Sequence, residues 1–208
     1  TINGKNTTKT PVSKFVTKSF TNKTNRKYKI NINHKVNLPT GTGFGTSGAT
    51  ALSLSLALND ALKSGLSKID CAKIAHIAEV SCRTGLGTVI AEMQGGFEVR
   101  IKEGAPGIGK IVPIKINKKH IMIALVLGSL STKTMLEEFE KKRSNFNVGQ
   151  QYIDYFLSNQ SIENFLDLSN KFSKLFNWNQ QIQNIMFEAQ NNGFVCGVAL
   201  FGETVFSL

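Results

Sequence analysis

Residues 39–49 form a glycine-rich segment that is chemically suited to bind an anion. It reads Pro-Thr-Gly-Thr-Gly-Phe-Gly-Thr-Ser-Gly-Ala, with four glycines within eight positions. Glycines let the backbone approach a ligand closely and turn several N–H groups toward it. The sequence that follows predicts a helix, whose free N–H groups and dipole favour negative charge at its start. Thr46 and Ser47 add hydroxyls that could bind phosphate oxygens or a magnesium ion.

The segment matches neither of two common nucleotide-binding fingerprints. No Gly-Lys-Ser/Thr closes it as in a Walker motif, and no suitably placed acid follows about 20 residues later as in dinucleotide-binding folds. Asp60 is the nearest acid, but it lies within the predicted helix. Two interpretations stay open: a phosphate-binding loop, or a tight structural loop that lets a buried helix pack on its strand.

A polar stripe runs along the helix predicted from Ser67 to Cys82, with Ser67 as its N-cap. Spacings of three and four place Ala72, His76, Glu79 and Arg83 on one face of this otherwise largely apolar helix. An unpaired buried polar group costs about 1–3 kcal/mol, so these groups need partners. One explanation is an internal ion pair of Glu79 with Arg83 or His76. The other is a carboxylate that holds magnesium against bound phosphates.

Other polar residues give weaker signals. Arg100, on a predicted strand after two glycines, suits a two-pronged grip on a carboxylate, although a solvated charge is the ordinary role of such an arginine. Thr132 lies where an apolar strand meets a predicted helix, where it can also belong to a helix cap. His34 and His120 are expected at the surface. The three cysteines are odd in number and lack CxxC spacing, which argues against a disulfide framework or a zinc site.

The elements that must position these residues mix helices and strands without regular alternation, which favours an α+β fold. Helices are predicted at 49–62, 67–82, 131–143 and, with breaks near Asn159 and Asn177, within 150–191. Strands are predicted at 27–36, 97–101, 111–116, 121–127, 194–200 and 204–208. A boundary between two subdomains is expected between Gly104 and Asn117.

The formal net charge of +11 is concentrated near the start of the chain. Residues 1–40 hold nine Lys or Arg and no acid, whereas the remaining 168 residues hold 16 bases and 14 acids. Because this segment has few aromatic residues for base stacking, we expect a solvated basic face rather than a nucleic-acid-binding surface. Attraction of an anionic substrate is a milder alternative.

No apolar run reaches the roughly 18–20 residues of a membrane span, and no signal peptide is visible, so a cytoplasmic protein is expected.

Taken in order, these motifs resemble the GHMP kinase superfamily and, more narrowly, its archaeal pantoate kinase family. The segment at 39–49 resembles the second, phosphate-binding motif of the superfamily. The narrower resemblance covers nearly the whole chain and rests on His76-Ile-Ala-Glu79, Arg83-Thr-Gly-Leu-Gly87, Gly95-Gly-Phe-Glu-Val-Arg100, Gly104-Ala-Pro-Gly107, Ser131-Thr-Lys133 and Gly202-Glu-Thr-Val-Phe206.

The resemblance implies a two-lobed α+β fold with mixed sheets packed against helices. It implies an ATP-phosphate-binding lobe at 1–110, incomplete at its start, and a C-terminal GHMP-kinase lobe at 111–208. The implied reaction is transfer of the ATP γ-phosphate to the 4-hydroxyl of pantoate, giving 4-phosphopantoate for coenzyme A synthesis. It further implies Mg²⁺ as cofactor and a homodimer, with no nucleic-acid or membrane partner.

The resemblance also implies roles for individual residues. Ser47 and Glu79 would hold Mg²⁺ and act in catalysis, and His76, Arg100 and Thr132 would contact pantoate. The ATP phosphates would be bound by Pro39, Gly41, Gly43, Gly45, Thr46, Ser47 and Gly48.

Two departures from the family pattern stand out. The family often has an aspartate directly after Gly-Leu-Gly, and Thr88 stands at this catalytic position here. The family chain also normally begins several dozen residues earlier, with a substrate-binding segment, and is expected to extend slightly beyond Leu208. Three other functions compete: a homoserine or mevalonate type of GHMP kinase, a non-catalytic ligand-binding homologue, and a nucleic-acid-binding module.

Overall fold

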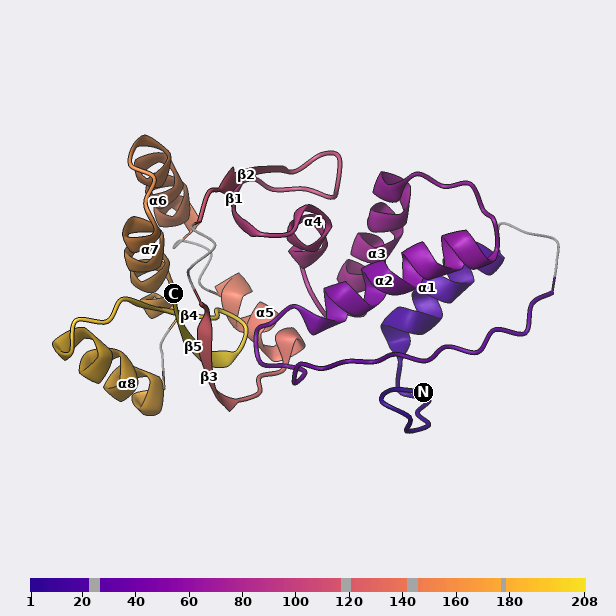
Figure 1. Ribbon diagram of the computed structural model, residues 1–208, viewed down its shortest axis with the longest axis horizontal. Coiled ribbons are helices and arrows are strands. Elements are labelled where there is room, and N and C mark those ends of the chain that lie inside the picture. Colours follow the sequence, from indigo (N-terminus) through magenta and orange to yellow (C-terminus); the bar gives the residue numbers. More distant parts are fainter. Residues whose placement is uncertain (23–26, 117–120, 142–145, 177–178) are drawn as a thin grey trace. The chain divides into compact units, whose positions relative to one another are not determined.

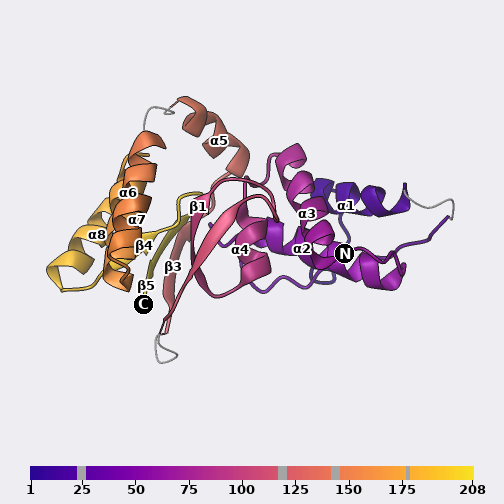
Figure 2. The ribbon, with the colours of Figure 1, turned by 90° about the horizontal axis from the view of Figure 1, so that it is seen from above.

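The computed structural model describes residues 1–22, 27–116, 121–141, 146–176 and 179–208 (Figures 1 and 2). The chain forms two compact units. The first contains Thr1–Pro39 and Gly45–Pro113, and the second contains Thr40–Phe44 and Ile114–Leu208. Helices and two small sheets together confirm the α+β class. Among the described residues, no helix is both long and apolar enough to cross a membrane.

The first unit is built on packed helices. In chain order its elements are α1 (Pro11–Thr21), α2 (Thr46–Ala61), α3 (Lys68–Cys82), α4 (Thr88–Gln94), β1 (Phe97–Lys102) and β2 (Lys110–Ile114), the last two paired as a sheet. Helices α1, α2 and α3 lie side by side in Figure 1 and share one core, whose fully enclosed members include Val16, Phe20 and a group of alanines. Small residues let helix axes approach closely, and the Ser55 hydroxyl donates a buried hydrogen bond of 2.8 Å to the Cys71 carbonyl.

The second unit combines an antiparallel sheet with helices. Its strands are β3 (Ile123–Gly128), β4 (Cys196–Val198) and β5 (Glu203–Ser207), and β5 lies in the middle, with Ser207 opposite both Ile123 and Cys196. Its helices are α5 (Thr132–Lys141), α6 (Phe146–Ser158), α7 (Ile162–Lys174) and α8 (Gln180–Asn191). The buried core of the sheet and α8 comprises Ile182, Cys196, Val198 and Val205.

Side-chain caps explain where several predicted helices begin. Ser67, Ser161 and Asn179 each accept a hydrogen bond from a backbone N–H three residues later, at 3.1, 3.1 and 2.8 Å. Such a cap satisfies one of the helix's free N–H groups and stabilises its first turn. The predicted start of α3 at Ser67 and the predicted break near Asn159 are therefore confirmed, whereas Asn177 lies outside the described residues.

The strand predicted at 27–36 is wrong. In the described part of this segment, residues 27–36, the only ladder contact is an isolated bridge between His34 and Ile2. Its alternating pattern has another cause, because Ile30 and Ile32 pack against the helical core while the residues between them face solvent. His34 is half-buried rather than at the surface, with its Nε2 3.0 Å from the Ser13 hydroxyl, and burial lowers its pKa. His120 lies outside the described residues.

The first half of the glycine-rich segment is built into the second unit. The Leu130 N–H donates to the Gly41 carbonyl at 2.8 Å, and the Thr204 hydroxyl donates to the Thr42 carbonyl at 2.7 Å. A methyl group at Gly202 would overlap the Thr42 backbone, and one at Gly43 would lie 2.5 Å from the Ala199 methyl. Glycine is therefore required at these positions because backbone segments meet there without room for side chains.

We predict that Gly202→Ala destabilises the protein by about 3 kcal/mol, because the added methyl group overlaps backbone that cannot move aside cheaply. Chemical denaturation monitored by circular dichroism would measure the change. Gly193→Ala is the control, because position 193 is open and an alanine there meets only the left-handed backbone cost of about 1–2 kcal/mol. Equal losses for both variants would contradict the close approach at Gly202.

Candidate active site

The second half of the glycine-rich segment begins α2. Gly45 precedes the helix in the left-handed conformation, with a φ of 67°, which favours glycine. A methyl group at Gly45 would lie 2.6 Å from Cγ2 of Thr88 and 2.9 Å from Oε1 of Glu92. The start of α2 therefore lies directly against one face of α4, and the half-buried Thr46 and Ser47 form its first turn.

Glu79 is buried next to this helix start. Only 1% of its surface is exposed, and the Thr84 hydroxyl donates to its Oε1 at 3.0 Å. A methyl group at Gly48 would lie 2.9 Å from its Oε2, and one at Gly85 would overlap the same oxygen. The two glycines thus leave the space that the carboxylate fills. The alternative ion pair with Arg83 is absent from the described residues, because Arg83 ends α3 with an exposed side chain.

A second carboxylate, that of Glu92 on α4, shares the space beside Gly48. Both of its oxygens would lie 2.8 Å from a methyl group at Gly48. Both are buried, and neither has a hydrogen-bond partner among the described residues. Burial, and next the negative charge of Glu79, raise the pKa of Glu92 to about 8, against a smaller opposing effect of the Ala49 N–H. Glu92 is not among the predicted site residues, because the sequence pattern predicts no helix at α4.

A basic pair lies on β1 and α3 of the same unit. A methyl group at Gly87 would overlap Nη1 of Arg100, so the guanidinium lies over this glycine. Nε of Arg100 and Nδ1 of His76 are buried without a hydrogen-bond partner in the described part of the chain. Burial lowers the pKa of His76. The negative charge of Glu79 acts to raise this pKa, and the positive charge of Arg100 lowers it further. The result is a neutral ring near pH 7 beside a cationic fork, which suits an anionic ligand with a hydroxyl group.

Burial also raises the pKa of Glu98, the neighbour of Arg100 on β1, although the Arg100 charge acts in the opposite direction. Its Oε2 is a further buried oxygen with no partner among the described residues. The first unit therefore contains several buried polar atoms without a partner among the described residues, and those of Glu92 lie at the start of α2. Such atoms need partners that a ligand can supply.

The first unit brings most of the predicted site residues together. Gly45 and Gly48 meet α4, Gly48 also meets Glu79, and Thr46 and Ser47 lie between these glycines in the first turn of α2. His76 and Arg100 interact electrostatically with each other. Pro39 belongs to this unit as well, ahead of the segment that joins the other one. Gly41, Gly43 and Thr132 belong to the second unit, where the two glycines serve close packing and Thr132 begins α5.

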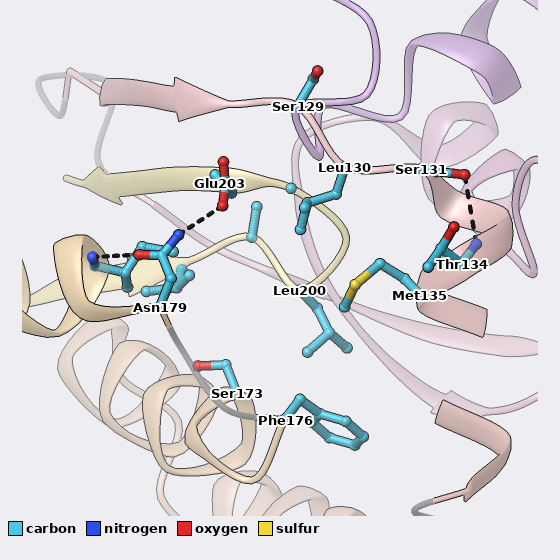
Figure 3. A pocket seen from close by; sticks show the side chains of 14 residues that line it. Ser129, Leu130, Ser131, Thr134, Met135, Ser173, Phe176, Asn179, Leu200 and Glu203 are labelled. Atoms are coloured by element: carbon cyan, nitrogen blue, oxygen red, sulfur yellow. Dashed lines mark hydrogen bonds between the residues drawn. The ribbon is translucent and has the colours of Figure 1, made fainter. Parts of the chain in front are cut away.

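The second unit has a cavity of about 360 Å³, drawn in Figure 3. Apolar side chains of Leu130, Met135, Phe176 and Leu200 line much of it. At its edges the Asn179 amide donates to Glu203 at 2.6 Å, and Ser131 accepts from the Thr134 N–H at 3.5 Å. Ser131 thus has the capping role that was the alternative to a substrate contact for this motif.

The charged groups near Gly48 fit a hard divalent cation. Carboxylate oxygens are the ligands that Mg²⁺ prefers, and it is usually held by one or two of them together with substrate phosphates and water. Among the described residues, no three His, Cys, Asp or Glu side chains form a complete metal-binding group. The protein would therefore supply part of the coordination and a phosphate ligand the rest.

Comparison with known proteins agrees with this arrangement. Residues 11–96 match the family model described as GHMP kinases N terminal domain. The chain is 37% identical to a pantoate kinase of Methanocaldococcus jannaschii over 137 residues, which cover 65% of this chain and 48% of that protein. It is 35% identical to a pantoate kinase of Thermococcus kodakarensis over 136 residues, 65% of this chain and 44% of the relative.

A pantoate kinase of Methanospirillum hungatei is 27% identical over 175 residues, 82% of this chain and 56% of the relative. The chain thus spans about half the length of these curated relatives. A solved structure titled "Phosphotransferase related to CoA biosynthesis pathway" superimposes with a TM-score of 0.80 and 25% identity, over 100% of this chain and 68% of that one. Residues 11–96 of the chain are thus similar to the N-terminal domain of GHMP kinases, and 65% of the chain is similar to the archaeal pantoate kinases.

Proposed function

We propose that this protein transfers the γ-phosphoryl group of ATP to the 4-hydroxyl of pantoate. One observation carries the proposal. The first unit contains buried carboxylates where α2 begins after its glycines, and it also contains buried nitrogens of Arg100 and His76 that have no hydrogen-bond partner among the described residues. The first feature suits a metal-bound phosphate chain, and the second suits a hydroxy acid. The relatives named pantoate kinase support the choice of substrate.

The start of α2 is the proposed phosphate-binding half of the site. Backbone N–H groups at Thr46, Ser47 and Gly48, aided by the helix dipole, would bind phosphate oxygens. The Ser47 hydroxyl and the Glu79 carboxylate would hold Mg²⁺, which when bound neutralises charge on the phosphates. Phosphate contacts of Pro39, Gly41 and Gly43 stay predictions of the family resemblance. The same holds for the ATP-phosphate-binding lobe at 1–110 and the C-terminal GHMP-kinase lobe at 111–208.

Arg100 and His76 form the proposed substrate-binding half. The guanidinium can bind the pantoate carboxylate with two parallel hydrogen bonds, and its buried Nε would gain the partner that the described residues do not supply. The neutral His76 ring can bind a substrate hydroxyl without adding charge. Thr132, at the start of α5, is a further proposed contact.

The chemical step forms a bond between the 4-hydroxyl oxygen and the γ-phosphorus. The bond from that phosphorus to the β,γ-bridging oxygen breaks, ADP leaves, and the hydroxyl proton is released. Thr88 cannot accept this proton as an aspartate could. Positioning of the two substrates and stabilisation of charge dominate phosphoryl transfer, so the reaction can proceed without a strong base at this position. A homodimer stays a prediction of the family resemblance, and a cytoplasmic location stays a prediction from the sequence composition.

We expect the chain to release ADP from ATP and Mg²⁺ with pantoate, and to do so less efficiently with mevalonate or homoserine. A coupled ADP-release assay with each acceptor alone would measure this. Turnover with mevalonate or homoserine only would contradict the acceptor assignment, and no turnover with any of the three would contradict kinase function for this chain.

Arg100→Lys should raise KM for pantoate by about 100-fold while changing KM for ATP little. Lysine keeps the charge but loses the two-pronged geometry, and losing such a contact costs about 2–3 kcal/mol. Steady-state kinetics with either substrate varied would show the difference. Arg83→Lys is the matched control, because Arg83 is exposed at the end of α3. If both variants behave alike, Arg100 does not bind the acceptor.

Thr88→Asp tests whether a base is missing. We expect kcat to change by less than about 10-fold and its pH profile to keep its shape, because positioning and charge stabilisation carry most of the rate. Measurement of kcat between pH 6 and 9 would decide. A gain of 100-fold would show that a carboxylate at this position is the limiting element.

A further inference from the structure

We infer that Glu92 is a second carboxylate ligand of the divalent cation, facing Glu79 across Gly48. The inference rests on the proposed function, because it assigns a further residue to the same site. It concerns a side chain that the family motifs do not single out and that the sequence analysis did not select.

The geometry places both carboxylates around one point. A methyl group at Gly48 would lie 2.8 Å from each Glu92 oxygen and 2.9 Å from Oε2 of Glu79. Gly48 is helical, so its backbone does not require glycine; what it provides is free space in the first turn of α2. Two acids from different helices, α3 and α4, therefore converge on the place where the phosphate-binding helix begins.

Apart from the Ala49 N–H, which lowers its pKa by a smaller effect, the described residues around Glu92 provide no partner for its charge. Its two oxygens are buried and have no hydrogen-bond partner among the described residues. The neighbouring charge that acts on it is that of Glu79, which has the same sign. Two carboxylates that both lie within 3 Å of one point repel each other unless a cation lies between them. A divalent cation would satisfy both at once, which explains why the pair is kept where water cannot reach Glu92's oxygens.

The position of Glu92 on α4 also explains how it reaches the site. Thr88 and Glu92 are four residues apart, so they share one face of this helix. That face meets Gly45, because a methyl group there would contact both side chains. The shorter Thr88 lies against the loop, while the longer Glu92 side chain extends to Gly48. The cation would thus be held from α2 by Ser47, from α3 by Glu79 and from α4 by Glu92.

Direct metal binding tests the inference. Mn²⁺ titrations of the 208-residue chain, followed by electron paramagnetic resonance with and without a non-hydrolysable ATP analogue, would give Kd values. We expect Glu92→Gln to weaken Mn²⁺ binding at least 10-fold, and Glu92→Asp to recover part of the loss because it restores the charge. Glu103→Gln, which removes an exposed acid from the same unit, is the matched control and should bind as the wild type does.

Thermal unfolding separates a ligand from a purely structural residue. With EDTA, the Tm of Glu92→Gln should be no lower than that of the wild type, because the substitution removes one of two neighbouring buried acids. When 10 mM Mg²⁺ is added, the Tm of Glu92→Gln should rise less than the Tm of the wild type does. Equal Mn²⁺ affinity of wild type and Glu92→Gln under both conditions, or no Mn²⁺ binding by the wild type, would overturn the inference. If Glu92→Gln binds Mn²⁺ weakly but the wild type does not phosphorylate pantoate, the proposed function alone fails.

Discussion

The close contact between α2 and α3 is the constraint on which the rest of the first unit depends. Ala51, Ala72, Ala75 and Ala78 are fully buried in the helical core, and the Ser55 hydroxyl bonds the α3 backbone inside it. Only small side chains allow this approach. Because Glu79 follows Ala78 directly, the same packing fixes how far its carboxylate lies from the start of α2. A larger residue among these alanines would separate the helices and displace the site without touching any of its polar groups.

The glycine-rich segment serves two physical purposes that look alike in the sequence. Gly41 and Gly43 adopt left-handed backbone and allow close packing against Leu130, Ala199 and Gly202 in the second unit. Gly45 and Gly48 instead make room for side chains of α3 and α4 in the first unit. The first two glycines thus serve close packing of backbone, and not the predicted packing of a buried helix on its strand, because no strand forms at 27–36. The phosphate interpretation stays a prediction, and it draws its support from the second pair.

Local patterns predicted the helices that have strong local signals, and failed where packing decides. α2 and α3 were predictable from an apolar run after the glycines and from the Ser67 cap. The strand predicted at 27–36 was wrong because alternating isoleucines face a helical core instead of a sheet. The seven-residue α4 is too short to show a clear period, and with it Glu92 was missed. Helical spacing marked His76 and Glu79 as a polar stripe, and the order of the motifs then assigned roles to them and to Arg100.

The candidate site concentrates features that a folded protein otherwise avoids. Buried oxygens of Glu92 and Glu98 and buried nitrogens of His76 and Arg100 have no partner among the described residues. Each such atom costs about 1–3 kcal/mol in the ligand-free protein, so several together are a large fraction of a typical domain's stability. Unpartnered polar atoms scattered over a protein could not be satisfied by one ligand. Glu92 lies at Gly48 and Arg100 lies at Gly87, so a cation bound at the first position and the carboxylate of a hydroxy acid bound at the second would satisfy these two groups.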